Sequence, residues 1–254
     1  IAAARDQVAG ADLVLIIVND SFYGGAGGTG VCTTYNGGQM IDVVTHETGH
    51  AASNLGDEYV YDTRAYAGGE PTRPNLTIQS YAPSCKWSAW NGTAVADGGT
   101  VGTFAGGAMD FSSGIYRPVN NACHMRDLDF GFCPVCREAI IRMMHSETNP
   151  ITASWSSSWY WLFFGNVNFG AFSACLDEIV PDASTYVVWN VDGSWVGSTN
   201  SFANGQARRY VLDRALAPGY HTVTGWVVDT SSMLAIGGWY SRPMRHVSWS
   251  FYQF

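Results

Sequence analysis

One predicted helix constrains the chain more than any other feature. Apolar residues recur at spacings of three and four from Gly38 onward, which predicts a helix that ends around residues 54–56. His46 and His50 lie four residues apart within it, so helix geometry places them about 40° apart on one face. Both imidazoles can then point at a single ion, and zinc suits such a pair.

Glu47 lies between these histidines along the same helix. It is offset by about 100° from His46 and about 60° from His50, close enough to meet a metal-bound water without ligating the ion. A carboxylate in that place takes the proton as the water attacks a carbonyl. The joint pattern predicts a catalytic zinc site, and the alternative is a pair of ordinary histidines on a half-buried helix.

A catalytic zinc needs a third protein ligand and an open fourth position. Asp57 and Glu58 are the nearest candidates, but an unbroken helix would carry residue 57 about 10 Å past His50. The segment Ser53-Asn54-Leu55-Gly56 contains poor helix formers and a glycine that can take positive φ, so the chain can turn back. We predict Asp57 as the ligand, with Glu58 as second choice; the alternative is an acidic pair at the surface.

Other elements are predicted before residue 150. A Gly-rich segment lacks the Gly-Lys-Ser/Thr ending of a phosphate loop, so it is interpreted as a flexible rim near a cleft. A long segment rich in Gly, Pro, Ser and Thr predicts irregular structure with short strands. The expected elements are a short helix at 2–9, a buried strand at 13–18, the Gly-rich loop at 24–30, the irregular segment at 61–116 and a last helix at 134–145.

The composition changes after Pro150 to short apolar runs separated by turn residues. These runs predict strands, and about a hundred residues of this pattern favour an immunoglobulin-like β-sandwich. The sequence therefore predicts two domains, residues 1–148 and 149–254. The expected strands are 186–189, 210–212 and 221–228, with turns at Asp192-Gly193 and Ala217-Pro218-Gly219.

Charge and hydropathy exclude two classes of partner. The chain has 21 acidic and 13 basic residues, with a formal net charge of -8. Phosphate binding needs clustered Lys and Arg, and no basic run is present, so we expect neither nucleic acid nor an anionic membrane surface as partner. The longest apolar run, residues 13–18, is far shorter than the ~20 residues of a membrane span.

Cysteine usage favours a secreted protein. Six cysteines, an even number, are typical of an oxidising compartment and of disulfide bonds, although fifteen pairings are possible and reduced cytosolic thiols are the alternative. Cys133-x-x-Cys136 also allows a structural zinc site with Cys123 and His124. Residues 1–5 lack the pattern of a signal peptide, as expected of a mature or trimmed form.

A set of motifs carries a resemblance to a known family. His46-Glu47-Thr48-Gly49-His50 runs into Leu55-Gly56-Asp57-Glu58-Tyr59, and further blocks follow in order. With them the sequence resembles the M64 peptidase family, named for bacterial immunoglobulin A peptidases, over roughly residues 12–145. The other matching blocks are 18–20 with 23–25, Glu70-Pro71, Lys86-Trp87, 116–118 and 133–140.

The resemblance implies a metzincin-like α/β (α+β) catalytic domain. It implies that Glu47 is the general base, that His46 and His50 are ligands, and that an acidic residue of the Asp-Glu-Tyr block completes the site. Metzincins also carry a methionine turn beneath the metal, for which Met125 is the candidate, with simple core packing as the alternative. Ser53-Asn54 stands where family members often have Gly-Gly.

The expected activity is that of a zinc-dependent endopeptidase acting on extracellular proteins or glycoproteins. Two alternatives stay open: an inactive zinc-containing module that binds glycan or protein, and a zinc amidase acting on a non-protein amide. Retention of Glu47 argues against the inactive module, because a structural zinc site needs no base. The C-terminal sandwich is expected to contact a polymer or glycan through exposed aromatic residues.

Overall fold

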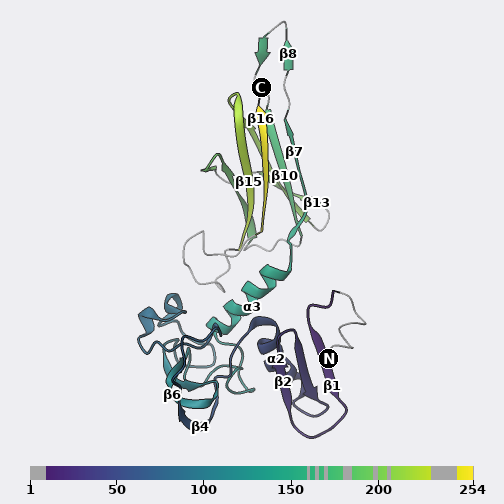
Figure 1. Ribbon diagram of the computed structural model, residues 1–254. Coiled ribbons are helices and arrows are strands. Elements are labelled where there is room, and N and C mark those ends of the chain that lie inside the picture. The colour runs from purple at the N-terminus through teal and green to yellow at the C-terminus, as the bar shows by residue number, and fades with distance from the viewer. Residues whose placement is uncertain are drawn as a thin grey trace. The chain divides into compact units, whose positions relative to one another are not determined.

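The computed structural model divides into two compact units, the first reaching Met143 and the second starting at Met144. Figure 1 shows the chain, and each unit is described by itself. The division lies near the predicted boundary between residues 148 and 149. The described residues are 10–158, 161–163, 166–168, 171–179, 185–196, 200–204, 207–229 and 245–253, so the short helix predicted at 2–9 lies outside them.

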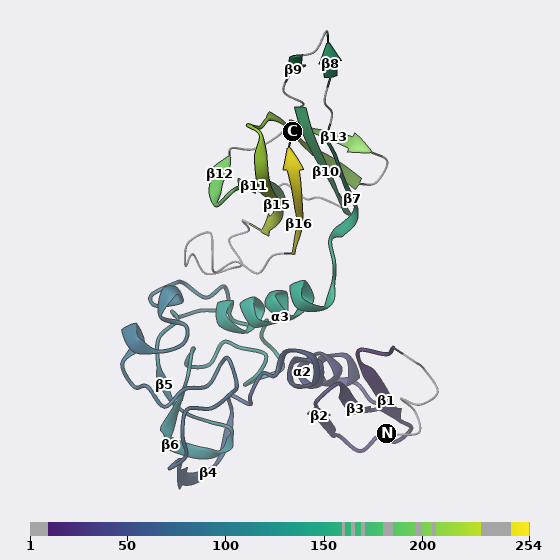
Figure 2. The same ribbon diagram turned by 45° about the horizontal axis from the view of Figure 1, so that its top comes forward.

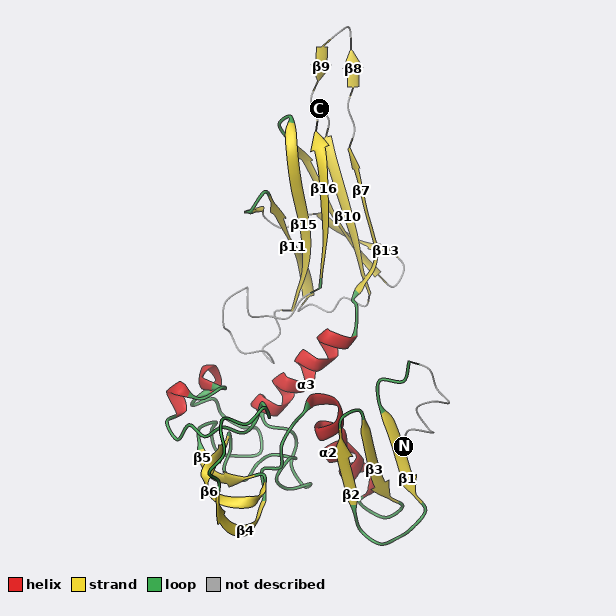
Figure 3. Cartoon of the chain, viewed as in Figure 1, coloured by secondary structure: helices red, strands yellow, loops and turns green. Residues whose placement is uncertain are grey.

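The first unit begins with a three-stranded sheet in the order β1-β3-β2. β1 (Val14–Val18) runs parallel to β3 (Val31–Tyr35), and β2 (Gly25–Gly28) runs antiparallel to β3. Helix α2 (Met40–Ser53) lies against β2 and β3 (Figure 3). The predicted strand at 13–18 is present, but the prediction that it is buried is wrong, since Ile17 on edge strand β1 is 54% exposed.

The Gly-rich segment is a strand and not the flexible loop predicted from sequence. Its glycines allow α2 to lie close to β2. A Cβ atom at Gly27 would lie 2.4 Å from the carbonyl oxygen of Glu47, and one at Gly25 would lie 2.5 Å from Cγ1 of Val43. Real Cβ contacts are not this short, so side chains at these positions would push the helix away.

Helix α2 ends where the sequence predicted, but at a different residue from the one expected to turn the chain. Asn54 adopts a left-handed conformation with φ 54°, and its N–H bonds to the carbonyl of Gly49. Gly56 has no positive φ. This position requires a glycine for a different reason: a Cβ atom there would lie 2.4 Å from Cδ1 of Leu76. Asn tolerates the left-handed region better than most residues, which explains its place at this helix end.

The rest of the first unit contains short elements and long connections. β4, β6 and β5 form a small sheet in that order, with β4 parallel to β6. The predicted irregular segment and last helix are both present. The bounds are β4 Val60–Ala65, η1 Ala82–Ser84, η2 Ser88–Trp90, β5 Phe104–Gly107, β6 Met109–Arg117 and α3 Pro134–Glu147.

The second unit contains two four-stranded sheets, ordered β13-β14-β10-β7 and β12-β11-β15-β16, and all their described pairings are antiparallel (Figure 2). A separate hairpin is formed by β8 and β9. The bounds are β7 Ile151–Ser158, β8 Trp161–Phe163, β9 Asn166–Asn168, β10 Ala171–Ile179, β11 Thr185–Val191, β12 Ser194–Val196, β13 Asn200–Asn204, β14 Ala207–Ala215, β15 Gly219–Asp229 and β16 His246–Gln253.

Buried residues from both sheets share one core in this unit. Trp189 of β11 is fully buried, and Leu212 of β14 and Val223 of β15 pack in the same cluster. The predicted turn at Asp192-Gly193 is confirmed, since both residues have positive φ and connect β11 to β12. The chain as a whole is therefore a mixed α/β protein with small sheets, in which strands predominate. Of the helices in the described residues, none is long and apolar enough to cross a membrane.

Candidate metal centre

Three of the predicted ligands lie together at the end of α2. Oδ1 of Asp57 lies 3.1 Å from Nε2 of His46 and 3.0 Å from Nε2 of His50. The two Nε2 atoms are 3.1 Å apart. His46 is buried, while His50 and Asp57 are half-buried. The chain reversal at Asn54 thus brings the carboxylate back to the histidine face that the sequence predicted.

Backbone carbonyls set the proton positions of both histidines. Nδ1 of His46 lies 3.0 Å from the carbonyl oxygen of His124, and Nδ1 of His50 lies 2.7 Å from that of Leu55. A carbonyl can only accept, so each Nδ1 carries the proton and each neutral ring has its lone pair at Nε2. Two lone pairs and a carboxylate oxygen of Asp57 therefore converge on one point, an arrangement that a cation stabilises.

The donor set fits zinc. Zinc bonds to imidazole nitrogen and carboxylate oxygen are about 2.0–2.2 Å long, so neighbouring tetrahedral ligands are about 3.3–3.5 Å apart. The three donor atoms of His46, His50 and Asp57 are separated by 3.0–3.1 Å, slightly less than that. Two histidines and one carboxylate would supply three ligands and leave a fourth position open towards the pocket, as in catalytic zinc sites.

Electrostatics within the cluster favour a charged Asp57. Burial raises the pKa of Asp57, but when the rings of His46 and His50 are protonated, their hydrogen bonds and charges lower it by more, so the net pKa lies well below its usual value. Burial lowers the pKa of His50, but the hydrogen bond and charge of Asp57 raise it above its usual value. The carboxylate is thus ionised at any pH at which the histidines can act as ligands.

Glu47 lies beside the ligands and is not one of the three that converge. Its carboxylate is half-buried against β2, where Oε1 would lie 2.8 Å from a Cβ at Gly25. Burial raises the pKa of Glu47 above its usual value; the charges of His46 and His50 lower it and that of Asp57 raises it. A carboxylate with a raised pKa is a stronger base, as a proton acceptor near neutral pH requires.

Glu47 and His46 open onto a pocket of about 580 Å³. Its wall includes Tyr23, Tyr59 and Tyr61, together with residues of the loop 126–129. A neighbouring hollow of about 350 Å³ shares Tyr23 and the start of β2 with it. Glu47 and His46 thus face a space large enough for a few side chains of a bound peptide.

Tyr59 is a site residue that sequence reasoning did not single out. Its ring stacks on His46, with centroids 6.0 Å apart and planes at 24°. Burial raises the pKa of Tyr59 above its usual value, and the charge of Asp57 and a hydrogen bond to that carboxylate raise it further. The phenol therefore stays protonated and donates to Asp57. The sequence feature that could have identified Tyr59 is its position two residues after Asp57.

The segment around Met125 packs against helix α2. Met125 is fully buried, and its sulfur would lie 2.9 Å from a Cβ at Gly49, between the two histidines in sequence. The preceding residue, His124, orients His46 through its carbonyl. Its own ring contacts the carbonyls of Asp42 and Phe130, so the interpretation of His124 as a ligand beside the cysteines is wrong.

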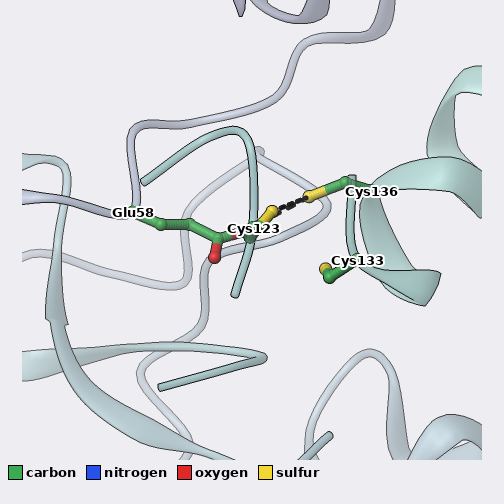
Figure 4. A group of neighbouring side chains, drawn as sticks. All are labelled: Glu58, Cys123, Cys133 and Cys136. Atoms are coloured by element: carbon green, nitrogen blue, oxygen red, sulfur yellow. Dashed lines mark hydrogen bonds between the residues drawn. The ribbon is translucent and has the colours of Figure 1, made fainter. Parts of the chain in front are cut away.

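Glu58, the second choice for the third ligand, contributes no donor atom to this cluster. It is fully buried and lies with Cys123, Cys133 and Cys136 in a separate cluster (Figure 4). The expectation of disulfides is also wrong where it can be checked. Cys32 and Cys85 are free thiols as well, so the five cysteines whose side chains the structure describes form no disulfide bond.

Two histidines of α2 and an aspartate just beyond its end, with Glu47 beside them, form a candidate metal site of the kind that metallopeptidases use. Over residues 2–97 the chain matches the family model described as IgA Peptidase M64. The predicted resemblance to the M64 peptidases is therefore confirmed over the part that carries α2 and Asp57. The blocks predicted beyond residue 97 lie outside the match, and no curated protein matches the chain.

Proposed function

We propose that this chain is a zinc-dependent peptidase that hydrolyses peptide bonds in proteins. The observation that carries the proposal is the convergence of His46 Nε2, His50 Nε2 and Asp57 Oδ1 beside Glu47 and an open pocket. The confirmed resemblance to M64 peptidases supports a metallopeptidase of metzincin-like type. Zinc follows from two imidazoles and one carboxylate in near-tetrahedral spacing.

Each group of the site has a separate role in the proposed reaction. Zinc, when bound, lowers the pKa of water and polarises a carbonyl oxygen. Glu47 would accept the proton of the attacking water and pass it to the leaving amine as the C–N bond breaks. Tyr59 would hold Asp57 through its hydrogen bond and keep the stacked ring of His46 in place.

The edge of β2 supports an extended substrate. β2 is the end strand of its sheet, and Gly24 and Gly25 line both hollows. A strand edge next to a catalytic group binds extended peptides by adding them as a further strand. We therefore propose that the substrate chain lies along β2, with its scissile bond beside Glu47.

The substrate class follows from the same resemblance. The matching family is described by its immunoglobulin A peptidases, so we propose proteins or glycoproteins outside the cell as substrates, with a secreted enzyme. The free thiols of five described cysteines remove one argument for that location, and the resemblance alone supports it. No feature of the described residues supports the predicted glycan or polymer contact of the second unit.

We also propose that the second unit is immunoglobulin-like. When the β8–β9 hairpin is left out, the strands from β7 to β16 correspond in chain order to strands A, B, C, C′, D, E, F and G of an immunoglobulin domain. The two sheets are then D-E-B-A and C′-C-F-G. That order is typical of immunoglobulin-like sandwiches, as is the buried Trp189 on strand C. Gly225 on strand F leaves room for its ring, because a Cβ there would lie 2.6 Å from Trp189.

The test combines a metal assay with a cleavage assay on a diverse peptide library. Wild-type protein should cleave peptides, and Glu47→Gln should keep the zinc and the fold but lose about 100-fold or more of kcat, since an amide accepts no proton. Glu147→Gln, at the exposed end of α3, serves as the matched control. Full activity of Glu47→Gln would contradict the assigned base, and cleavage of non-peptide amides alone would favour the amidase.

A further inference from the structure

Outside the proposed active site, the first unit holds a second cluster of metal-binding side chains. It contains Glu58, Cys123, Cys133 and Cys136, and all four are fully buried. Glu58 follows Asp57, Cys123 belongs to the connection between β6 and α3, and the other two cysteines lie at the start of α3 (Figure 4). Segments far apart in the sequence therefore meet at one point.

The spacing of the donor atoms fits a tetrahedral ion. Sγ of Cys123 and Sγ of Cys136 are 3.7 Å apart. Zinc–sulfur bonds of about 2.3 Å place two tetrahedral thiolates about 3.8 Å apart, whereas a disulfide requires about 2.05 Å. Oε1 of Glu58 lies 3.5 Å from the first sulfur and 3.2 Å from the second. Cys133 completes the group, with the four donor atoms all within 4.8 Å of one another.

Glu58 also has an oxygen without a partner. Asn75 donates a hydrogen bond to Oε1 over 2.9 Å, while Oε2 is buried and accepts no hydrogen bond within the described part of the chain. A carboxyl group buried without full pairing is costly, and buried charges in proteins are paired or bind metals. Oε1 lies against the sulfurs of Cys123 and Cys136, so an ion bound there would neutralise the charge of this carboxylate.

We propose that Glu58, Cys123, Cys133 and Cys136 bind a second zinc ion with a structural role. Three thiolates select zinc over magnesium or calcium, which prefer oxygen ligands. Four protein ligands at zero exposure leave no open position, which distinguishes this site from the one at His46. The start of α3 adds to the binding, because a helix N-terminus stabilises thiolates.

The second ion would hold the backbone that orients the proposed active site. The N–H of Glu58 donates to the carbonyl of Met125 over 2.8 Å, and Arg126 donates to the carbonyl of Glu58 over 3.0 Å. The same loop gives the His124 carbonyl that fixes His46. An ion bound by Glu58 and Cys123 thus joins the segment of Asp57 to the segment that orients a histidine.

Metal counting on the full chain tests the proposal independently of activity. Wild-type protein should hold two zinc ions per chain, and the double variant His46→Gln/His50→Gln should hold one. X-ray absorption of that variant should show mainly sulfur neighbours at about 2.3 Å. One zinc in the wild type and none in the double variant would overturn the second site, while leaving the proposed active site intact.

A cysteine variant adds a second measurement. Cys136→Ser should lose one zinc and keep the other, with a lower Tm, whereas Cys85→Ser, a buried cysteine outside the cluster, should keep both. If Cys136→Ser fails to fold, cobalt bound to His46→Gln/His50→Gln should give thiolate-to-metal charge-transfer absorption. Absence of that band, or an intact mass showing two thiols lost to a disulfide, would overturn the proposal.

Discussion

Asp57 Oδ1 lies 3.1 Å from His46 Nε2, although an unbroken helix would carry residue 57 about 10 Å beyond the second histidine. The reversal at Asn54 makes this approach possible. The position of the third donor of the proposed site therefore depends on the left-handed conformation of Asn54 at the end of α2. Changes at the donor and at the turn should both weaken metal binding, for different physical reasons.

Asp57→Asn removes the charge of the proposed third ligand. Zinc affinity should fall by well over the ~10 to 100-fold that loss of a supporting group costs, and activity should fall with it. In Glu58→Gln, the loss of zinc affinity at this site should be no greater than that ~10 to 100-fold range. Competition with a chelator measures both, with Asp62→Asn at the surface as control. If Glu58→Gln strips this zinc and Asp57→Asn does not, the assignment of Asp57 is wrong.

Asn54 can be tested with two variants that both lack its amide group. Asn54→Gly should preserve the turn, because glycine takes positive φ without strain. Asn54→Ala should be less stable than Asn54→Gly by about 1 kcal/mol, since the Cβ atom of alanine makes the left-handed conformation sterically unfavourable. Urea denaturation measures the difference, and zinc affinity should follow the same order. Equal stability of the two variants would show that φ at this position does not control the turn.

The histidine face was predictable because it depends on local geometry alone. Residues four apart on a helix share a face whatever surrounds them. The need for a turn before Asp57 was predictable for the same reason. The residue that turns was not, because Asn54 and Gly56 can both adopt positive φ, and Gly56 is required by a contact with Leu76 twenty residues away.

Contacts between distant segments account for the rest. The cysteine cluster was predicted with His124, yet Glu58 is its fourth member, because the fold brings a residue beside Asp57 to the start of α3. Apolarity predicted a buried β1, but α2 covers β2 and β3, which leaves Ile17 exposed. Burial depends on which elements pack against a strand, and no local pattern reports that.

A charged pair in the second unit should make stability depend on pH. Nδ1 of His221 lies 2.6 Å from Oδ2 of Asp192, and its Nε2 lies 2.7 Å from the carbonyl of Ala217. Both partners only accept, so the ring is fully bonded when protonated. The hydrogen bond to Asp192 raises the pKa of His221 above its usual value, and the same bond lowers the pKa of Asp192.

The sign of the effect follows from these directions. A raised histidine pKa stabilises the fold below about pH 6.5 and is lost as pH rises through the folded value, while a lowered aspartate pKa stabilises above about pH 4. The Tm advantage of wild type over His221→Gln should therefore be larger near pH 6 than near pH 8.5. Asp192→Asn should behave likewise. A difference in Tm that does not change with pH would contradict the pair's role.

The close approach of α2 to β2 gives the last prediction a matched control within one strand. Gly27→Ala would place a methyl group 2.4 Å from the carbonyl oxygen of Glu47 and 2.8 Å from Cβ of His50. The helix must move, so we expect a loss of about 1–3 kcal/mol in the free energy of unfolding and a clear loss of activity.

Gly28→Ala introduces the same methyl group one residue further along β2, where no atom lies within 4 Å of it. Its stability should change by about 0.5 kcal/mol or less, and activity should be retained. Denaturation and peptide cleavage measured side by side separate the two variants. Because strand propensity changes equally in both, any excess loss in Gly27→Ala reports the contact with the helix that carries Glu47 and His50. Equal behaviour of the two variants would mean that β2 does not fix the position of that helix.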